Sequence, residues 1–112
     1  MDDEALMDAV TAVSGSGPAY VFHFIEALTD AGVAAGLPRE TAGLLAMQTV
    51  MGAGALADAS PDSPTKLREQ VTSPNGTTAA ALDVLMGGDR LKKLVAEAVE
   101  AARKRSVELG KS

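Results

Sequence analysis

Cysteine and tryptophan are absent from this 112-residue chain, and histidine occurs once. Without cysteine there can be no disulfide, thiolate metal site or cysteine nucleophile. A Ser–His–Asp triad would have to use His23, which lies between Phe22 and Phe24 on a predicted helix, so we interpret it as a packed or interface histidine. No cluster of histidine and carboxylates has the spacing of metal ligands, so we predict no metal site.

Positive charge is also scarce. The chain has ten Lys and Arg residues and fifteen Asp and Glu residues, which gives a net charge of −5. Phosphate binding needs a basic surface, so the charge disfavours a helical nucleic-acid binder. The one basic cluster, Arg103–Arg105, has glutamates on both sides and is interpreted as a solvated helix face. The acidic start, MDDEALMDA, is neither a signal nor a transit peptide, and the composition is compatible with the cytoplasm, where we expect the protein.

Aromatic residues make up 3% of the chain, whereas hydrophobic residues make up 46%. The core must therefore be built from Ala, Leu, Val and Met, whose side chains allow close helix–helix contact. The hydrophobic content and the length suit one folded domain. No segment has a convincing strand pattern, and we predict an all-α fold.

Periodicity and breaker residues predict the helices. Gly36 and Pro38 separate the second from the third, residues 60–64 form a loop, and Gly87-Gly88 breaks the chain before Asp89, the expected cap of the last helix. The predicted helices cover residues 2–10, 18–35, 41–57, 65–71, 77–86 and 90–109.

Two helices have one apolar face each. In the second helix we expect a buried face of Val21, Phe24, Ile25 and Leu28. In the last helix the charge pairs Lys93/Glu97 and Glu100/Lys104 should lie on the exposed side. Its apolar stripe is formed by Leu91, Leu94, Val95, Ala98, Val99 and Ala102.

The helix predicted for residues 41–57 contains no charged residue. We therefore expect it to be buried on most sides. A membrane span is the alternative, but the run is short and contains Gln48, Thr49 and three glycines. A 112-residue domain can hardly bury a whole helix by itself, so an interface between copies is the favoured interpretation, with glycines that allow close approach.

The stretch SGSGPAY, residues 14–20, was compared with the dinucleotide-binding fingerprint. It lacks the third glycine, follows no strand and has no βαβ unit around it. As a bare pattern it is typical of a turn that enters a helix, with Pro18 in the first helical turn.

The stretch VTSPNGTT, residues 71–78, combines a tight turn with hydroxyls where a helix begins. A helix N-terminus carries unpaired N–H groups and a partial positive charge. Gly76 allows close approach, and Ser73, Thr77 and Thr78 add hydroxyls, so a small carboxylate could bind without Lys or Arg. The alternative is a capped helix with no ligand, in which Thr77 or a neighbour is the N-cap.

Two segments together resemble the C-terminal domain of pyrroline-5-carboxylate reductases, and the resemblance covers nearly the whole chain. They are SGSGPAYVFHFIEALTDAGVAAGLPRE and REQVTSPNGTTAAALDVL, in the family's order and spacing. The family's usual form has Gly-Gly after the proline, where this chain has Asn75-Gly76. Asn tolerates left-handed backbone angles better than other non-glycine residues, so we expect the turn to be kept.

The resemblance implies a fold and an activity. Residues 1–112 would be the helical C-terminal domain for dimerisation and substrate binding, interlocked with a second copy in a homodimer that can assemble into larger rings. The Rossmann domain would precede it and is absent from this chain. Such enzymes reduce 1-pyrroline-5-carboxylate to L-proline, the last step of proline biosynthesis, by hydride transfer from NADPH or NADH.

The resemblance also implies roles for single residues. The substrate loop would consist of Ser73, Gly76, Thr77 and Thr78. Its N–H groups would hold the substrate carboxylate, and the Thr78 hydroxyl would form a hydrogen bond with the ring nitrogen. Ser16, Gly17 and Pro18 would lie beside the nicotinamide. A protonated imine is already electrophilic, so the protein mainly has to position it. Alone, this chain should be inactive, and a non-catalytic helical dimerisation module with the same fold is the alternative.

Overall fold

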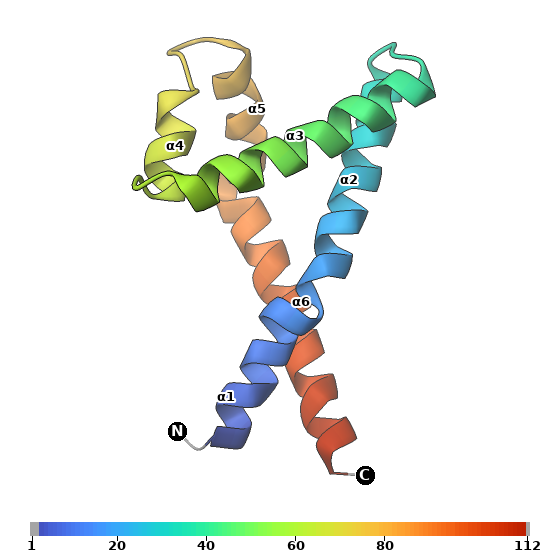
Figure 1. Ribbon diagram of the computed structural model, residues 1–112, viewed down its shortest axis with the longest axis vertical. Coiled ribbons are helices and arrows are strands. Elements are labelled where there is room, and N and C mark those ends of the chain that lie inside the picture. The colour runs from blue at the N-terminus through green and yellow to red at the C-terminus, as the bar shows by residue number, and fades with distance from the viewer. Residues whose placement is uncertain (1–2, 112) are drawn as a thin grey trace. The chain divides into compact units, whose positions relative to one another are not determined.

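The computed structural model describes residues 3–111, and every regular element in that range is a helix (Figure 1), so the all-α prediction is confirmed. Two short elements, η1 and η2, are a π-helical and a 3-10 turn. In chain order the elements are α1 (Asp3–Val10), η1 (Thr11–Gly15), α2 (Gly17–Ala34), α3 (Arg39–Ala59), α4 (Pro64–Gln70), α5 (Thr77–Met86), η2 (Gly87–Asp89) and α6 (Arg90–Gly110).

The chain divides into two compact units. The first combines the N-terminal segment up to Ala19 with the segment from Pro74 onward. In it α1 and η1 lie along α6, and α5 packs against η2 and α6 (Figure 1). The Ser106 hydroxyl donates to Oδ1 of Asp8 at 2.7 Å, and Ala12 in η1 is fully buried. Segments from the two ends of the chain thus form one helical unit.

The second unit, residues 20–73, depends on small residues where α2 meets α3. Ala42 and Ala46 of α3 are buried, and a methyl group added at Gly32 of α2 would lie 3.1 Å from the Ala42 Cβ. The Arg39 Nη1 donates to Oδ1 of Asp30 at 3.0 Å across the same pair of helices. The close contact expected from a chain poor in aromatics is therefore present.

The helix ends confirm some of the expected breakers. Gly36 follows α2 with a φ of +113°, a value that favours glycine. The Ser63 hydroxyl caps α4 by accepting from the Lys66 N–H at 3.2 Å. The prediction for Asp89 is wrong in one respect. Asp89 directly precedes α6, but its φ is +55° and its side chain makes no capping hydrogen bond.

The predicted buried faces are largely exposed in the single chain. Val21 and Phe24 are 44% and 47% exposed, and only Ile25 and Leu28 are half-buried. On α6, Val99 and Ala102 are half-buried, while the other stripe residues, Leu91, Leu94, Val95 and Ala98, are exposed. Periodicity identifies an apolar face, but burial also requires an element that covers it.

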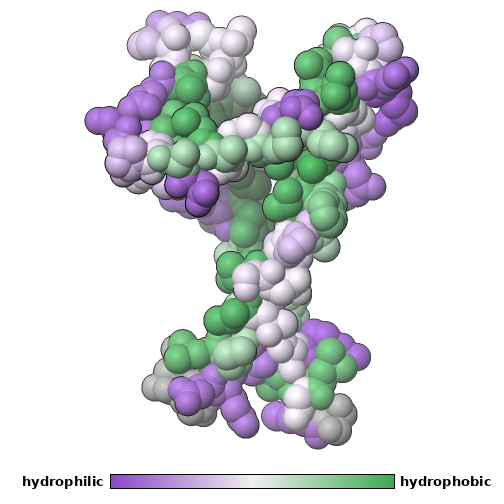
Figure 2. All heavy atoms as spheres, viewed as in Figure 1, coloured by the Kyte–Doolittle hydropathy of each residue, from purple (hydrophilic) through white to green (hydrophobic). Residues whose placement is uncertain are grey.

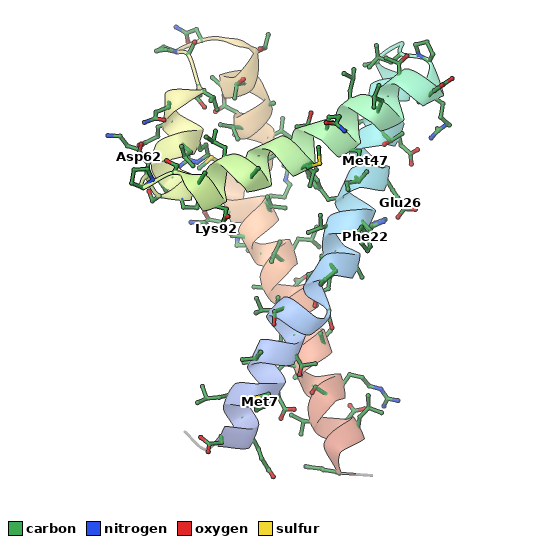
Figure 3. The ribbon with its side chains drawn as sticks, viewed as in Figure 1. Met7, Phe22, Glu26, Met47, Asp62 and Lys92 are labelled. Atoms are coloured by element: carbon green, nitrogen blue, oxygen red, sulfur yellow. The ribbon has the colours of Figure 1, made fainter. Side chains whose placement is uncertain are left out.

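The same correction applies to α3. Ala42 and Ala46 are its only buried residues, and Met51 is 58% exposed. Figure 2 shows hydrophobic residues open to solvent along α2 and α3, and Figure 3 shows the Met47 side chain on α3 and the Phe22 side chain on α2. One copy therefore does not provide the burial expected for this helix, and its burial between copies stays a prediction. No helix within residues 3–111 combines the length and the apolar character that crossing a membrane requires.

The polar predictions are also corrected in part. The His23 side chain is 82% exposed, with Nδ1 3.1 Å from Oε1 of Glu26, so it is not packed within one chain. Glu100 binds Arg103 through two hydrogen bonds of 2.6 and 2.8 Å and not Lys104. The planar guanidinium explains this preference, and it holds the pKa of Glu100 below its ordinary value.

The second predicted charge pair, Lys93/Glu97, makes no ion pair within the described part of the chain. Both side chains are exposed on α6, where an isolated pair gains little over hydration. Arg105 pairs with Glu108 at 2.8 Å, as expected of a solvated helix face.

Replacement of Gly32 tests the close contact between α2 and α3. Alanine usually stabilises a helix interior by up to about 1 kcal/mol relative to glycine. At Gly32 the new methyl group would crowd Ala42, so we expect Gly32→Ala to lower the free energy of unfolding by about 1 kcal/mol, measured by urea denaturation at fixed protein concentration. The control is Gly43→Ala, whose methyl would lie 3.9 Å from the Thr29 Cγ2, an ordinary contact. An equal increase in the free energy of unfolding in both variants would contradict the close contact between Gly32 and Ala42.

Candidate functional site

The turn between α4 and α5 is built by backbone conformation. Asn75 has a φ of +61°, which is the left-handed region expected for it. Gly76 then adopts an extended conformation, with φ −89° and ψ −175°, and α5 begins at Thr77. The predicted bounds of this helix, Thr77 to Met86, are confirmed. The left-handed Asn75 is thus followed by the extended Gly76, after which the helix starts.

No side chain caps the N-terminus of α5. Gly76 is the N-cap residue and has no side chain to offer, and its carbonyl accepts the first helical hydrogen bond, from the Ala80 N–H at 3.2 Å. The N-cap is therefore not Thr77 but its neighbour Gly76, as the alternative interpretation allowed, and no side-chain hydrogen bond accompanies it. The N–H groups of the first turn have no partner inside a helix, and the helix dipole adds partial positive charge there. These groups can hold an anion.

The hydroxyls predicted for the site lie on both sides of this helix start in the sequence. Thr77 is exposed and Thr78 is half-buried in the first turn of α5, and Ser73 is exposed before the turn. Within residues 3–111 none of these three side chains makes a hydrogen bond. Thr72, in contrast, donates to the Arg68 carbonyl at 2.6 Å, so it completes the end of α4. The free hydroxyls can therefore donate to or accept from a ligand.

The second predicted motif lies where η1 meets α2. The Ser16 N–H donates to the Thr11 carbonyl at 2.8 Å, the Ser14 hydroxyl donates to the Val10 carbonyl at 3.0 Å, and α2 begins at Gly17. Ser16 and Gly17 are half-buried and Pro18 is exposed. Pro18 stands in the first turn of α2, as predicted. The π-helical turn was missed, because neither periodicity nor composition distinguishes it from an α-helical turn.

The two motifs do not meet within one chain. Residues 14–19 and 74–78 belong to the first unit, in which η1 and α5 both contact α6, whereas Ser73 belongs to the second unit. However, η1 lies beside α6 together with α1, whereas Thr77 begins α5 at a separate part of that unit (Figure 1). Residues that the resemblance places on the substrate and on the nicotinamide are thus apart in a single copy.

Three hollows of the described residues lie away from the predicted site residues. One hollow of about 350 Å³ lies between α1 and α6 and is lined by residues such as Asp3, Met7 and Val107. Two others, of about 430 and 350 Å³, lie between α2 and α3. At the start of α5, Gly76 and Thr78 are half-buried and Thr77 is exposed.

Metal chemistry finds no support in the described part of the chain. Residues 3–111 contain no group of three or more histidine and carboxylate side chains that could hold a metal ion. The chemistry available at the α5 start is that of N–H groups, hydroxyls and a helix dipole. These groups can bind and orient a small anion.

Comparison with known proteins gives consistent matches. The family described as "Pyrroline-5-carboxylate reductase dimerisation" matches residues 4–109. The chain is 53% identical to a pyrroline-5-carboxylate reductase from Pseudomonas aeruginosa over 109 residues, which are 97% of this chain and 40% of that protein.

Two solved structures are also similar. A pyrroline-5-carboxylate reductase from Coxiella burnetii matches with a TM-score of 0.91 and 45% identity, over 97% of this chain and 40% of that one. A Plasmodium falciparum pyrroline carboxylate reductase, whose structure has NADP bound, matches with a TM-score of 0.87 and 43% identity, over 93% of this chain and 42% of that one. The chain thus spans about 40% of the length of the relatives that it matches.

Substitutions at Asn75 test the geometry of the turn. A non-glycine residue with a Cβ strains at φ +61°, and asparagine partly escapes this cost. We expect Asn75→Ala to lower the free energy of unfolding by about 1 kcal/mol, whereas Asn75→Gly should leave it unchanged or raise it. Chemical denaturation of both variants measures the difference. If alanine and glycine gave equal stability, the left-handed turn would not form in solution.

Proposed function

We propose, because the chain belongs to the pyrroline-5-carboxylate reductase dimerisation family, that it is the C-terminal part of an enzyme that reduces 1-pyrroline-5-carboxylate to L-proline. In this proposal residues 1–112 supply the substrate loop and the dimer interface. A preceding Rossmann domain supplies most of the binding site for NADPH or NADH. The observation that carries the proposal is the uncapped start of α5, with free N–H groups beside free hydroxyls.

The substrate would bind at this helix start. Its carboxylate would accept hydrogen bonds from the N–H groups at Gly76, Thr77 and Thr78, where the dipole favours negative charge. The Thr78 hydroxyl, half-buried in the first turn, would form a hydrogen bond with the ring nitrogen. Ser73 would contribute a further hydroxyl from the other side of the turn. A small anion then needs no Lys or Arg, in agreement with the acidic chain.

The reaction requires the protein mainly to orient the substrate ring for hydride transfer. NADPH or NADH supplies a hydride for the C=N carbon when it is bound. The N–H groups and the Thr78 hydroxyl fix the substrate ring by two separate points, which limits its rotation. The same hydroxyl can hold the proton on the ring nitrogen and so keep the imine electrophilic. No histidine or metal is required for these tasks.

Ser16, Gly17 and Pro18 would lie beside the nicotinamide. The half-buried Ser16 and Gly17 offer little side-chain bulk, so a flat ring could approach the backbone there. A similar chain, the Plasmodium falciparum reductase, has NADP bound in its structure. Since the two motifs are apart in one copy, the complete site requires other parts of the assembled enzyme.

A homodimer would cover the exposed apolar residues. Leu44, Met47 and Met51 of α3 are exposed, and all three lie in its uncharged stretch, residues 41–57. A second copy of the chain is the proposed cover, and such dimers would assemble further into rings. A cytoplasmic location stays a prediction of the sequence.

The role of Thr78 can be tested in the full-length enzyme. Thr78→Ala removes the hydroxyl at the ring nitrogen, so we expect kcat/KM to fall about ten- to hundredfold, with assembly unchanged and partial recovery in Thr78→Ser. The matched control is Thr65→Ala, because Thr65 is also the second residue of a helix, α4, and is exposed. Steady-state NADPH oxidation and light scattering give both readouts. Full activity of Thr78→Ala would exclude the assigned role of Thr78.

The interface on α3 makes a separate prediction. Met51→Glu places a charge on the exposed apolar side of α3, and burying it between copies would be costly. We expect the unaltered chain to be a dimer or larger by light scattering and Met51→Glu to shift it toward monomer. Met51→Leu keeps the surface apolar and should assemble normally. A folded, unaltered monomer would rule out this interface.

A further inference from the structure

The helical path from α1 into α2 contains an irregular turn at the motif that we place beside the nicotinamide. In an α-helix the Ser16 N–H would donate to the carbonyl four residues back. It donates instead to the Thr11 carbonyl, five residues back, at 2.8 Å. Thr11–Gly15 therefore form a single π-helical turn, a rare element that is frequent at functional sites.

The extra residue in this turn sets the direction of the residues after it. Each residue of an α-helix turns by about 100°. Without the insertion, Ser16–Pro18 would therefore be rotated about the helix axis by roughly that angle relative to α1. The turn is anchored on one side, because Ala12 is fully buried and η1 contacts both α1 and α6. The π-helical turn thus determines where the motif points.

The Ser14 hydroxyl ties this turn to the end of α1. It donates to the Val10 carbonyl, four residues back, at 3.0 Å. Serine bonds of this kind compete with the regular helical pattern and often bend helices. Ser14 itself is exposed, so its bond adds little to a buried core. Its contribution is to the local shape of the turn.

We propose that Ser14 is a positioning residue, whose hydroxyl holds η1 in its π-helical form and thereby aims Ser16, Gly17 and Pro18 at the nicotinamide. The inference rests on the proposed function, since the place of the nicotinamide belongs to that proposal. Ser14 acts through its neighbours and does not itself have to touch the cofactor. The effect should therefore appear in cofactor binding and not in substrate binding or assembly.

The test uses the full-length enzyme with Ser14→Ala and Ser14→Thr. The dissociation constant of NADPH is measured by calorimetry without substrate, together with KM for both reactants and the mass by light scattering. Loss of one hydrogen bond predicts a rise of about three- to tenfold in the NADPH constant for Ser14→Ala. Threonine can form the same hydrogen bond, so Ser14→Thr should restore the NADPH dissociation constant of the unaltered enzyme. KM for pyrroline-5-carboxylate and the assembly should not change.

The control is Thr29→Val, which removes the same kind of bond from the regular part of α2. The Thr29 hydroxyl donates to the Ile25 carbonyl at 2.7 Å. This variant should leave the NADPH constant unchanged. An unchanged constant in Ser14→Ala, or an equal rise in Thr29→Val, would overturn the role of Ser14 while the proposed function stands. Absence of turnover by the unaltered full-length enzyme would overturn the proposed function and this inference with it.

Discussion

The exposed apolar surface of a single copy is the constraint on which the rest of the structure depends. Within residues 3–111 only Ala12, Ala42 and Ala46 are buried, and no large side chain is. Alanine contacts let helices approach closely, but each removes little apolar area from water. The long helices α3 and α6 therefore keep Leu, Met and Val side chains exposed. Their stability requires a cover that one copy does not provide.

The proposed site at α5 depends on the same cover. Gly76, the N-cap of this helix, has no side chain that could bind the N–H groups of the first turn. The left-handed Asn75 nevertheless holds the turn that produces it. In the proposed function, this start would become a binding site when other parts of an assembly enclose it and exclude water. Assembly and substrate binding would then be two consequences of one architecture.

Sequence reasoning predicted the helices well and burial poorly. Gly36, Asn75 and Thr77 act through local backbone rules, so the ends of α2 and the start of α5 could be predicted. The exposure of Val21 and Phe24 depends on which elements cover them, and the periodicity of the sequence carries no information about the covering element. Glu100 binds Arg103 and not Lys104 because the planar guanidinium forms two hydrogen bonds with the carboxylate, and sequence spacing does not show this difference. The amino-acid composition of Thr11–Gly15 does not distinguish a π-helical turn from an α-helical one. The backbone conformation around Ser14 could therefore be learned only from the structure.

The most direct test of the account is NADPH oxidation in the presence of pyrroline-5-carboxylate, with the full-length enzyme and with this chain alone. We expect turnover by the full-length enzyme and none by the isolated chain, because this chain would supply the substrate loop and the interface while most of the cofactor site would lie elsewhere. Absence of turnover by folded full-length protein, with either NADPH or NADH, would contradict it. The turn at Asn75 would then be a helix start without a substrate.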